Sequence, residues 1–222
     1  MKLALFDLDH TLLPLDSDHA FGEYLVQIGW ADAAEHRRRN DAFYQDYLAG
    51  TLDVAAYIEF ATGAWRGRSP AEQQQLTAGF MRDIIEPALR DSARALVQRH
   101  RDQGERLALV TSTNDFITAP IAQRFGFETL IATELDRDGQ GRVTGRIRGV
   151  PNLREGKVVK VQAWLASLGL GWDDFEAISC YSDSTNDLPL LERATHPVAT
   201  NPAPALAAIA QERGWPLLHL FE

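Results

Sequence analysis

Cysteine is almost absent from this sequence: Cys180 is the one cysteine among 222 residues. The chain therefore cannot form an internal disulfide, and its fold needs no oxidising compartment. Long apolar runs are missing as well. No stretch reaches the roughly 20 apolar residues of a membrane span, and acid appears at Asp7, too early for a signal peptide. We expect a cytoplasmic protein that does not insert into membranes.

Positive charge is scarce. The chain carries 22 Lys and Arg residues against 31 Asp and Glu residues, a formal net charge of -9. Such a protein repels nucleic acid and anionic membrane surfaces, so we expect neither as a partner. A small phosphorylated metabolite is compatible with this balance, because a metal ion and a few placed cations decide the charge locally. The sequence does not indicate an oligomeric state.

Short apolar runs alternate with helical patterns along most of the chain. The hydrophobic fraction is 45% and the charged fraction 24%, both ordinary for a globular protein. Strand-like runs lie at 2–6, 106–110, 129–133, 176–181, 197–200 and 217–220. Helical patterns lie between them, at 89–103, 116–125, 157–168 and 202–213. This alternation predicts an α/β fold, a doubly wound parallel sheet with helices on both faces.

Two segments interrupt the alternation. From about Asp16 to Glu86 the pattern is helical throughout and rich in aromatic residues, which predicts an insert of three or four helices. We therefore expect a core domain of residues 1–15 and 88–222, with a helical cap domain at 16–87. In residues 133–149, the turn signal Asp138-Gly139 between two extended runs predicts a hairpin.

The first predicted strand ends in FDLDHTL, which holds Asp7 and Asp9. In open α/β sheets, ligands bind beyond the carboxyl ends of the strands. Two carboxylates this close repel each other and need a cation, a shared proton or both. Magnesium suits hard oxygen ligands beside phosphate, so we expect Mg²⁺ here.

Anion-binding residues follow at other element ends. The second strand ends in LALVTST, where the Thr111 hydroxyl and free backbone N–H groups predict an anion site that also includes Ser112. Lys157 stands at a predicted helix start and offers a positive charge to a phosphate oxygen. Lys160, one turn later, is the alternative.

Acid follows the fourth apolar run directly, in CYSDSTND. We expect Asp183 to be a metal ligand and Asp187 either to hold metal-bound water or to orient the lysine. Four acids, one hydroxyl and one lysine, each at a predicted strand end or helix start, suit phosphoryl transfer. In this reaction, positioning and charge neutralisation supply most of the catalysis.

These motifs resemble those of the haloacid dehalogenase-like (HAD) superfamily of phosphatases, and most of all the subgroup of phosphoserine phosphatase. FDLDHTL matches the DxDxT motif, and Thr111, Lys157 and SDSTND match the next three motifs in order. The helical insert resembles that family's cap. The resemblance implies a magnesium-dependent hydrolase of a small phosphomonoester, such as phosphoserine or histidinol phosphate.

The resemblance also implies roles. Asp7 would attack phosphorus and become an aspartyl-phosphate, while Asp9 would act as general acid and then as base. Asp7, the main-chain carbonyl of Asp9 and Asp183 would hold Mg²⁺. Phosphoserine phosphatases carry a Glu nine positions after the nucleophile, which reads the substrate amine. Asp16, one methylene shorter, stands there in this chain, and we assign it to substrate binding.

Simpler interpretations stand beside these. Thr111 and Asp187 could each be a helix N-cap instead. The aromatic residues of the insert are expected to be core residues rather than a cage around the substrate. Arg66, Arg68 and Arg82 read as surface residues rather than as ligands of a second anionic group. Two other functions would use the same residues: a phosphotransferase or mutase, and a non-catalytic phosphate-binding module.

Overall fold

The computed structural model describes residues 1–221. Its strands are β1 (Lys2–Phe6), β2 (Arg106–Asn114), β3 (Leu130–Thr133), β4 (Leu135–Arg137), β5 (Val143–Ile147), β6 (Ala177–Ser182), β7 (His196–Thr200) and β8 (Leu217–Leu218). Its α-helices are α1 (Ser17–Gln27), α2 (Ala33–Ala49), α3 (Val54–Gly63), α4 (Pro70–Phe80), α5 (Glu86–Ala88), α6 (Asp91–Asp102), α7 (Asp115–Phe125), α8 (Glu155–Ser167), α9 (Leu188–Leu191) and α10 (Pro204–Arg213). A π-helical turn covers Met81–Ile85, and 3-10 turns cover Trp172–Asp174 and Thr185–Asp187.

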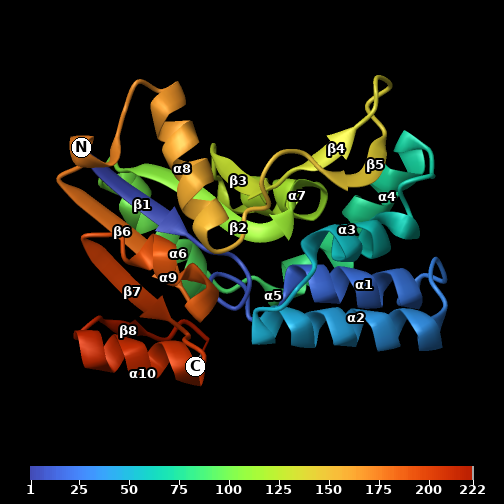
Figure 1. Ribbon diagram of the computed structural model, residues 1–222, viewed down its shortest axis with the longest axis horizontal. Coiled ribbons are helices and arrows are strands. Elements are labelled where there is room, and N and C mark those ends of the chain that lie inside the picture. Colours follow the sequence, from blue (N-terminus) through green and yellow to red (C-terminus); the bar gives the residue numbers. More distant parts are fainter. Residues whose placement is uncertain (222) are drawn as a thin grey trace.

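Six strands form one parallel sheet in the order β3-β2-β1-β6-β7-β8 (Figure 1). The chain builds β2 and β3 on one side of β1 and then returns to build β6, β7 and β8 on the other side. The predicted doubly wound parallel sheet is thereby confirmed. Because the topology changes direction beside β1, a ligand site is expected beyond the carboxyl end of this strand.

The residues of β1 supply two apolar cores, because alternate side chains of a strand point to opposite faces. Leu3 and Leu5 pack with side chains of α8, α9 and α10, whereas Ala4 and Phe6 pack with those of α6 and α7. All four are at most 1% exposed. Each buried leucine stabilises the fold by about 2 kcal/mol, so the strand that precedes Asp7 is firmly held.

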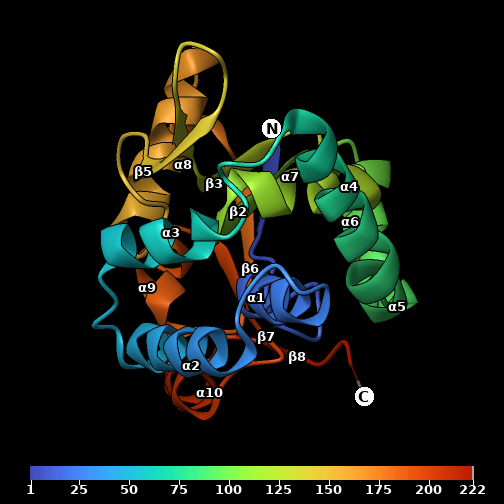
Figure 2. The same ribbon diagram turned by 90° about the vertical axis from the view of Figure 1, so that its right-hand side faces the viewer.

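The predicted helical insert is observed as four helices, α1 to α4, followed by the π-helical turn. Each of the four begins after a side chain that accepts hydrogen bonds from backbone N–H groups of the first turn. These capping residues are Asp16, Asp32, Asp53 and Ser69. Figures 1 and 2 show the insert beyond the carboxyl end of β1. The domain boundaries given above stay a prediction.

Aromatic packing joins the insert to the sheet. Trp65, which is 1% exposed, stacks on Phe116 of α7 with ring centroids 3.9 Å apart. Phe21 meets Phe80 edge to face at 5.0 Å. These rings belong to the same apolar core as Phe6, so one side of the insert is fixed to the α6 and α7 face of the sheet.

The structure moves the predicted end of one strand and adds detail to the predicted hairpin. β2 continues to Asn114, past the predicted end at Val110, because a register shift lets Asn114 pair with Thr133 of β3. The predicted hairpin is confirmed as the antiparallel pair β4 and β5, and β5 packs against α3 of the insert. Within residues 1–221, no helix has both the length and the apolar character to cross a membrane.

Candidate active site

Asp7 lies directly after β1, and its backbone N–H donates to the carbonyl of Tyr181 in the neighbouring strand β6 at 2.9 Å. The ammonium of Lys157 donates to its Oδ1 at 2.8 Å, although the two residues are 150 positions apart. The backbone of Asp7 is therefore fixed to the neighbouring strand, and its carboxylate is paired with the buried ammonium of Lys157. The structure joins the first and third sequence motifs at this contact.

The turn after Asp9 brings a hydroxyl back to Asp7. The carbonyl of Leu8 accepts hydrogen bonds from three N–H groups of the turn, including that of Thr11. Thr11 Oγ1 then lies 3.0 Å from Asp7 Oδ2 and 3.2 Å from Asp183 Oδ1, and it accepts the N–H of Asp183 at 3.1 Å. One buried hydroxyl thus links the carboxylates of the first and fourth motifs.

Lys157, 1% exposed, is the lysine of this cluster. Its ammonium also donates to Asp187 Oδ2 at 2.7 Å, and the hydroxyl of Ser182 donates to the same oxygen at 2.7 Å. Burial alone would lower the pKa of Lys157, but the charges of Asp187 and Asp7 raise it above its ordinary value. Lys160 points elsewhere, to the carbonyl of Ala132 at 2.8 Å.

Asp187 makes no capping hydrogen bond to the helix that follows it. Of the roles predicted for this residue, its contacts favour the orientation of Lys157.

Gly156 allows α8 to begin where Lys157 reaches Asp7. A Cβ atom at this position would lie 2.1 Å from the main-chain carbonyl oxygen of Pro151, which cannot move aside as a side chain could. We therefore expect Gly156→Ala to lower the free energy of unfolding by about 1–3 kcal/mol, as overpacking does. Urea denaturation measures this change.

Gly63 is the matched control, since a Cβ atom there would meet nothing within 4 Å. Gly63→Ala should leave stability unchanged or raise it by up to about 1 kcal/mol, because alanine restricts the unfolded chain. Equal losses from the two alanine variants would contradict the close approach at Gly156.

Both oxygens of Asp9 are occupied by donors. The N–H of Ser17 donates to Oδ1 at 2.7 Å, and the hydroxyl of Thr113 donates to Oδ2 at 2.8 Å. Burial and the negative charge of Asp16 raise the pKa of Asp9 to about 6 despite these donors. A carboxyl group with such a pKa can both give and take a proton near neutrality.

Thr111 is fully buried, and its hydroxyl accepts the N–H of Thr113 at 3.2 Å. Ser112 and Thr113, rather than Thr111, line the cavity described below. Sequence reasoning missed Thr113 because it placed the end of the strand at Val110. With β2 extended, Thr113 lies two positions beyond Thr111 and reaches Asp9.

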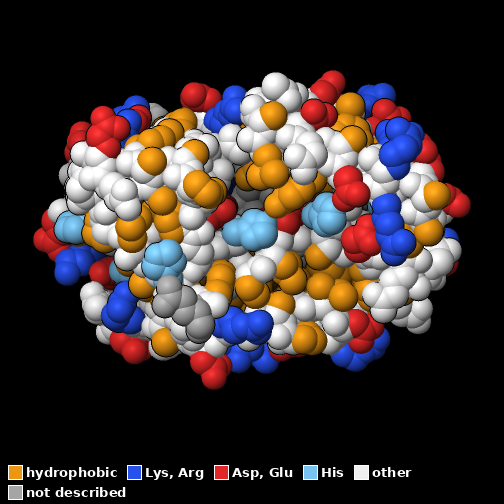
Figure 3. Space-filling model, turned by 90° about the horizontal axis from the view of Figure 1, so that it is seen from below, with side chains coloured by type: hydrophobic (Ala, Val, Ile, Leu, Met, Phe, Trp, Pro, Cys, Tyr) orange, Lys and Arg blue, Asp and Glu red, His pale blue; other side chains and the backbone are white. Residues whose placement is uncertain are grey.

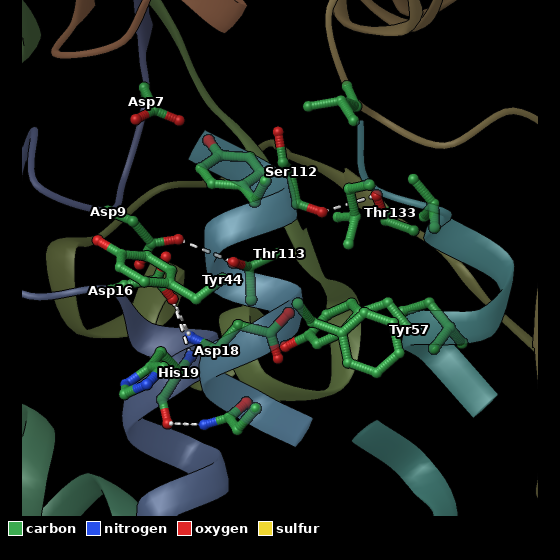
Figure 4. Close-up of a pocket in the computed structure, with 17 residues that line it drawn as sticks. Asp7, Asp9, Asp16, Asp18, His19, Tyr44, Tyr57, Ser112, Thr113 and Thr133 are labelled. Carbon is green, nitrogen blue, oxygen red and sulfur yellow. Dashed lines mark hydrogen bonds between the residues drawn. The ribbon is translucent and has the colours of Figure 1, made fainter. Parts of the chain in front are cut away.

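A cavity opens between the sheet and the insert (Figure 4). Its wall holds acids from both parts, hydroxyl groups from the sheet and aromatic rings from the insert. The space-filling view in Figure 3 shows acidic and histidine side chains around a hollow bordered by hydrophobic ones. The lining residues that the structure describes include no Lys or Arg.

Asp16 lines this cavity, as expected of a substrate-binding residue, but it is also the N-cap of α1. Its Oδ1 accepts the N–H groups of Asp18 and His19 at 3.0 and 2.8 Å. Burial raises the pKa of Asp16, and the two N–H groups act in the opposite direction. One oxygen of this carboxylate is thus committed to the helix.

The interpretation of the insert's aromatic residues as core is only partly right. Phe21, Tyr24 and Trp65 are buried, whereas the rings lining the cavity are Phe43, Tyr44, Tyr47 and Tyr57. The reason is that the insert borders both the apolar core and the cavity, and aromatic side chains of α2 and α3 face the cavity.

The three arginines weighed as ligands of a second anion lie away from the cavity lining. Arg68 stacks over the ring of Trp30, and Arg82 pairs with Asp83. A Cβ atom at Gly145 would meet the guanidinium of Arg66, so this arginine packs against the hairpin. Their placement agrees with the simpler interpretation.

The donor set fits a hard divalent cation. Burial and the negative charges of Asp7 and Asp187 raise the pKa of Asp183 to about 9, so these carboxyl groups lie close enough to repel one another when ionised. No cluster of three His, Cys, Asp or Glu side chains in residues 1–221 has the arrangement of a metal site. Two carboxylates and a main-chain carbonyl, the set that the family resemblance implies, do not require such a triad.

A comparison with protein-family models identifies this arrangement. The model described as haloacid dehalogenase-like hydrolase matches residues 4–192, which include Asp7, Lys157 and Asp187. The chain belongs to the haloacid dehalogenase-like hydrolase family. The resemblance found in the motifs is confirmed.

Individual proteins are similar to this chain over nearly its whole length. A protein of Neisseria meningitidis serogroup C named histidinol-phosphatase is 41% identical over 98% of both chains. A crystal structure of a Bordetella pertussis Tohama I protein with unknown function is 51% identical, with a TM-score of 0.93 over 99% of both chains. A substrate-bound phosphoserine phosphatase structure shares the fold, with a TM-score of 0.66 and 16% identity over 98% of this chain and 92% of that one.

Proposed function

We propose that this chain is a magnesium-dependent phosphatase that hydrolyses a small phosphomonoester through an aspartyl-phosphate on Asp7. The observation that carries the proposal is the convergence of Asp7, Lys157 and Asp183 at the carboxyl ends of β1 and β6. The similarity to a protein named histidinol-phosphatase supports phosphate chemistry. Asp7, Asp183 and the main-chain carbonyl of Asp9 would hold Mg²⁺, which would neutralise charge on the carboxylates and on the phosphoryl oxygens.

The residues divide the reaction into two steps. Asp7 attacks phosphorus, so a carboxylate–phosphorus bond forms as the ester P–O bond breaks, and Asp9 gives its proton to the leaving alcohol. Water then attacks the phosphoryl group while Asp9 takes a proton from it, which releases inorganic phosphate and restores the Asp7 carboxylate. Lys157 orients Asp7, since it is hydrogen-bonded to Oδ1.

Around the phosphoryl group, Ser112 offers a hydroxyl. Its Oγ is buried and has no partner among the described residues, so it is available to a phosphate oxygen. Thr111 would act indirectly, by holding Thr113 in place, because its hydroxyl accepts the N–H of Thr113. Thr113 in turn stabilises the ionised form of Asp9 that the second step requires.

The motifs suggested phosphoserine and histidinol phosphate as substrates, and the residues that line the cavity favour histidinol phosphate. Phosphoserine carries a carboxylate, and the described residues that line the cavity include neither Lys nor Arg to meet it. Histidinol phosphate has an amine and an imidazole and no carboxylate, which suits a wall of acids and aromatic rings. We therefore take histidinol phosphate, or a phosphomonoester of similar charge, as the substrate.

Phosphate release from the two esters tests the proposal. With Mg²⁺, the protein should release phosphate from histidinol phosphate with a kcat/KM at least about 10-fold above that for phosphoserine, the discrimination expected when an anionic group is buried without a partner. Removal of divalent ions with EDTA should stop the reaction, and added Mg²⁺ should restore it. Phosphate release that persists in EDTA, or a preference for phosphoserine, would count against it.

A further inference from the structure

Asp18 carries a carboxylate oxygen that nothing in the fold accounts for. Its Oδ1 is shielded from solvent, and within residues 1–221 it is the one such carboxylate oxygen without a hydrogen-bond partner. The residue lies in the first turn of α1 and lines the cavity. In Figure 4 its side chain extends into the space between the two walls, and Tyr57 points its hydroxyl toward it.

Among the described residues that line the cavity beside Asp18, none is a Lys or Arg. Burial raises the pKa of this carboxyl well above its ordinary range, and the charges of Asp16 and Asp9 raise it further. His19 is the basic residue of the cavity wall, and its Nε2 is paired with Asp41 at 3.0 Å. A buried carboxyl group with an unpaired oxygen destabilises a fold unless a ligand satisfies it.

The neighbouring acids are already engaged. Asp9 is bonded to Ser17 and Thr113, and Asp16 caps α1 through Oδ1. In the view of Figure 4, Asp9 and Thr113 lie between Asp7 and Asp18. A ligand whose phosphoryl group sits at Asp7 would therefore extend past Asp9 to reach Asp18 with its other end.

We propose that Asp18 is a specificity-determining residue whose Oδ1 binds a cationic nitrogen of the substrate, an ammonium or an imidazolium. The inference rests on the proposed function, since it requires the phosphoryl group to lie at Asp7. The hydroxyl of Tyr57 points toward this carboxyl group, and the interaction between them acts to lower the pKa of Asp18. The rings of Tyr44 and Tyr57 line the same cavity and offer π-faces to the cation.

A ratio of two substrates tests the proposal. Phosphate release is measured with histidinol phosphate and with phenyl phosphate, whose leaving group has no charge, for the wild-type protein and for Asp18→Asn. We expect the ratio of the two kcat/KM values to fall by about 10- to 100-fold in Asp18→Asn, the loss expected for one hydrogen bond between charged groups. A ratio is insensitive to any fraction of the variant that fails to fold.

Two further variants sharpen this experiment. Asp46→Asn makes the same change in charge at an exposed position of α2 and should leave the ratio at its wild-type value. Asp18→Glu keeps the carboxylate and should recover part of the preference. An unchanged ratio in Asp18→Asn, or an equal fall for both esters, would overturn the assignment of Asp18 while leaving the phosphatase intact. Absence of phosphate release by the wild-type protein would overturn both.

Discussion

Asn in place of Asp7 is expected to abolish phosphate release, with kcat lower by about 10⁴-fold or more, because the amide cannot attack phosphorus. The substitution is isosteric. Its carbonyl oxygen can still accept from Lys157, and Thr11 can still form a hydrogen bond to the amide. The fold should therefore persist while the chemistry is lost, and phosphate release at saturating substrate with Mg²⁺ measures the difference.

Asp46→Asn is the control for this experiment too, since it makes the same chemical change at an exposed position. Thermal unfolding of both variants shows whether the protein is folded. Turnover by Asp7→Asn within a factor of about 10 of the wild type would remove Asp7 from the role of nucleophile, because loss of a nucleophile costs far more.

Replacing Lys157 with methionine is expected to damage both stability and catalysis. The variant leaves Asp7 and Asp187 buried without their cation, a loss of about 3–5 kcal/mol in the free energy of unfolding. Urea denaturation at neutral pH measures this loss. The deficit should shrink as pH falls, because burial raises the pKa of Asp187 and protonation then removes its buried negative charge. Phosphate release should fall by at least about 100-fold, since Asp7 loses the group that orients it.

Lys160 offers a control on the same helix. Its ammonium binds the carbonyl of Ala132 and lies 3.4 Å from Glu134, whose side chain is 41% exposed. Lys160→Met should therefore lower the free energy of unfolding by no more than about 1 kcal/mol and leave turnover near the wild-type value. Similar effects from the two substitutions would contradict the assignment of Lys157 to the site.

The sheet could be predicted from sequence because its strands are buried on both faces and read as short apolar runs. Lys2–Phe6 illustrates this, with four fully buried side chains directly followed by Asp7. Since parallel strands end at one edge, residues after β1 and β6 had to come close to one another. The motifs placed Lys157 in the same site as Asp7, but they predicted a contact with a phosphate oxygen, and the hydrogen bond to Asp7 across 150 positions is known only from the structure.

The wall contributed by the insert could not be predicted in the same way. A helix such as α2 shows helical spacing, but spacing does not tell which neighbour a side chain faces when the helix borders both a core and a cavity. Tyr44 and Tyr47 therefore looked like core residues. The role inferred here for Asp18 was hidden for a different reason: a motif led to Asp16, and only the structure showed that α1 uses one oxygen of that residue as a cap.

Trapping the intermediate tests the central claim most directly. The protein is mixed with Mg²⁺ and ³²P-labelled substrate, quenched in acid within one turnover, and digested for mass spectrometry of the labelled peptide. We predict one acid-stable, base-labile phosphoryl group on the carboxylate of Asp7, absent in Asp7→Asn and absent without a divalent ion. Label on another residue, or rapid phosphate release by a protein that never carries label, would contradict the account.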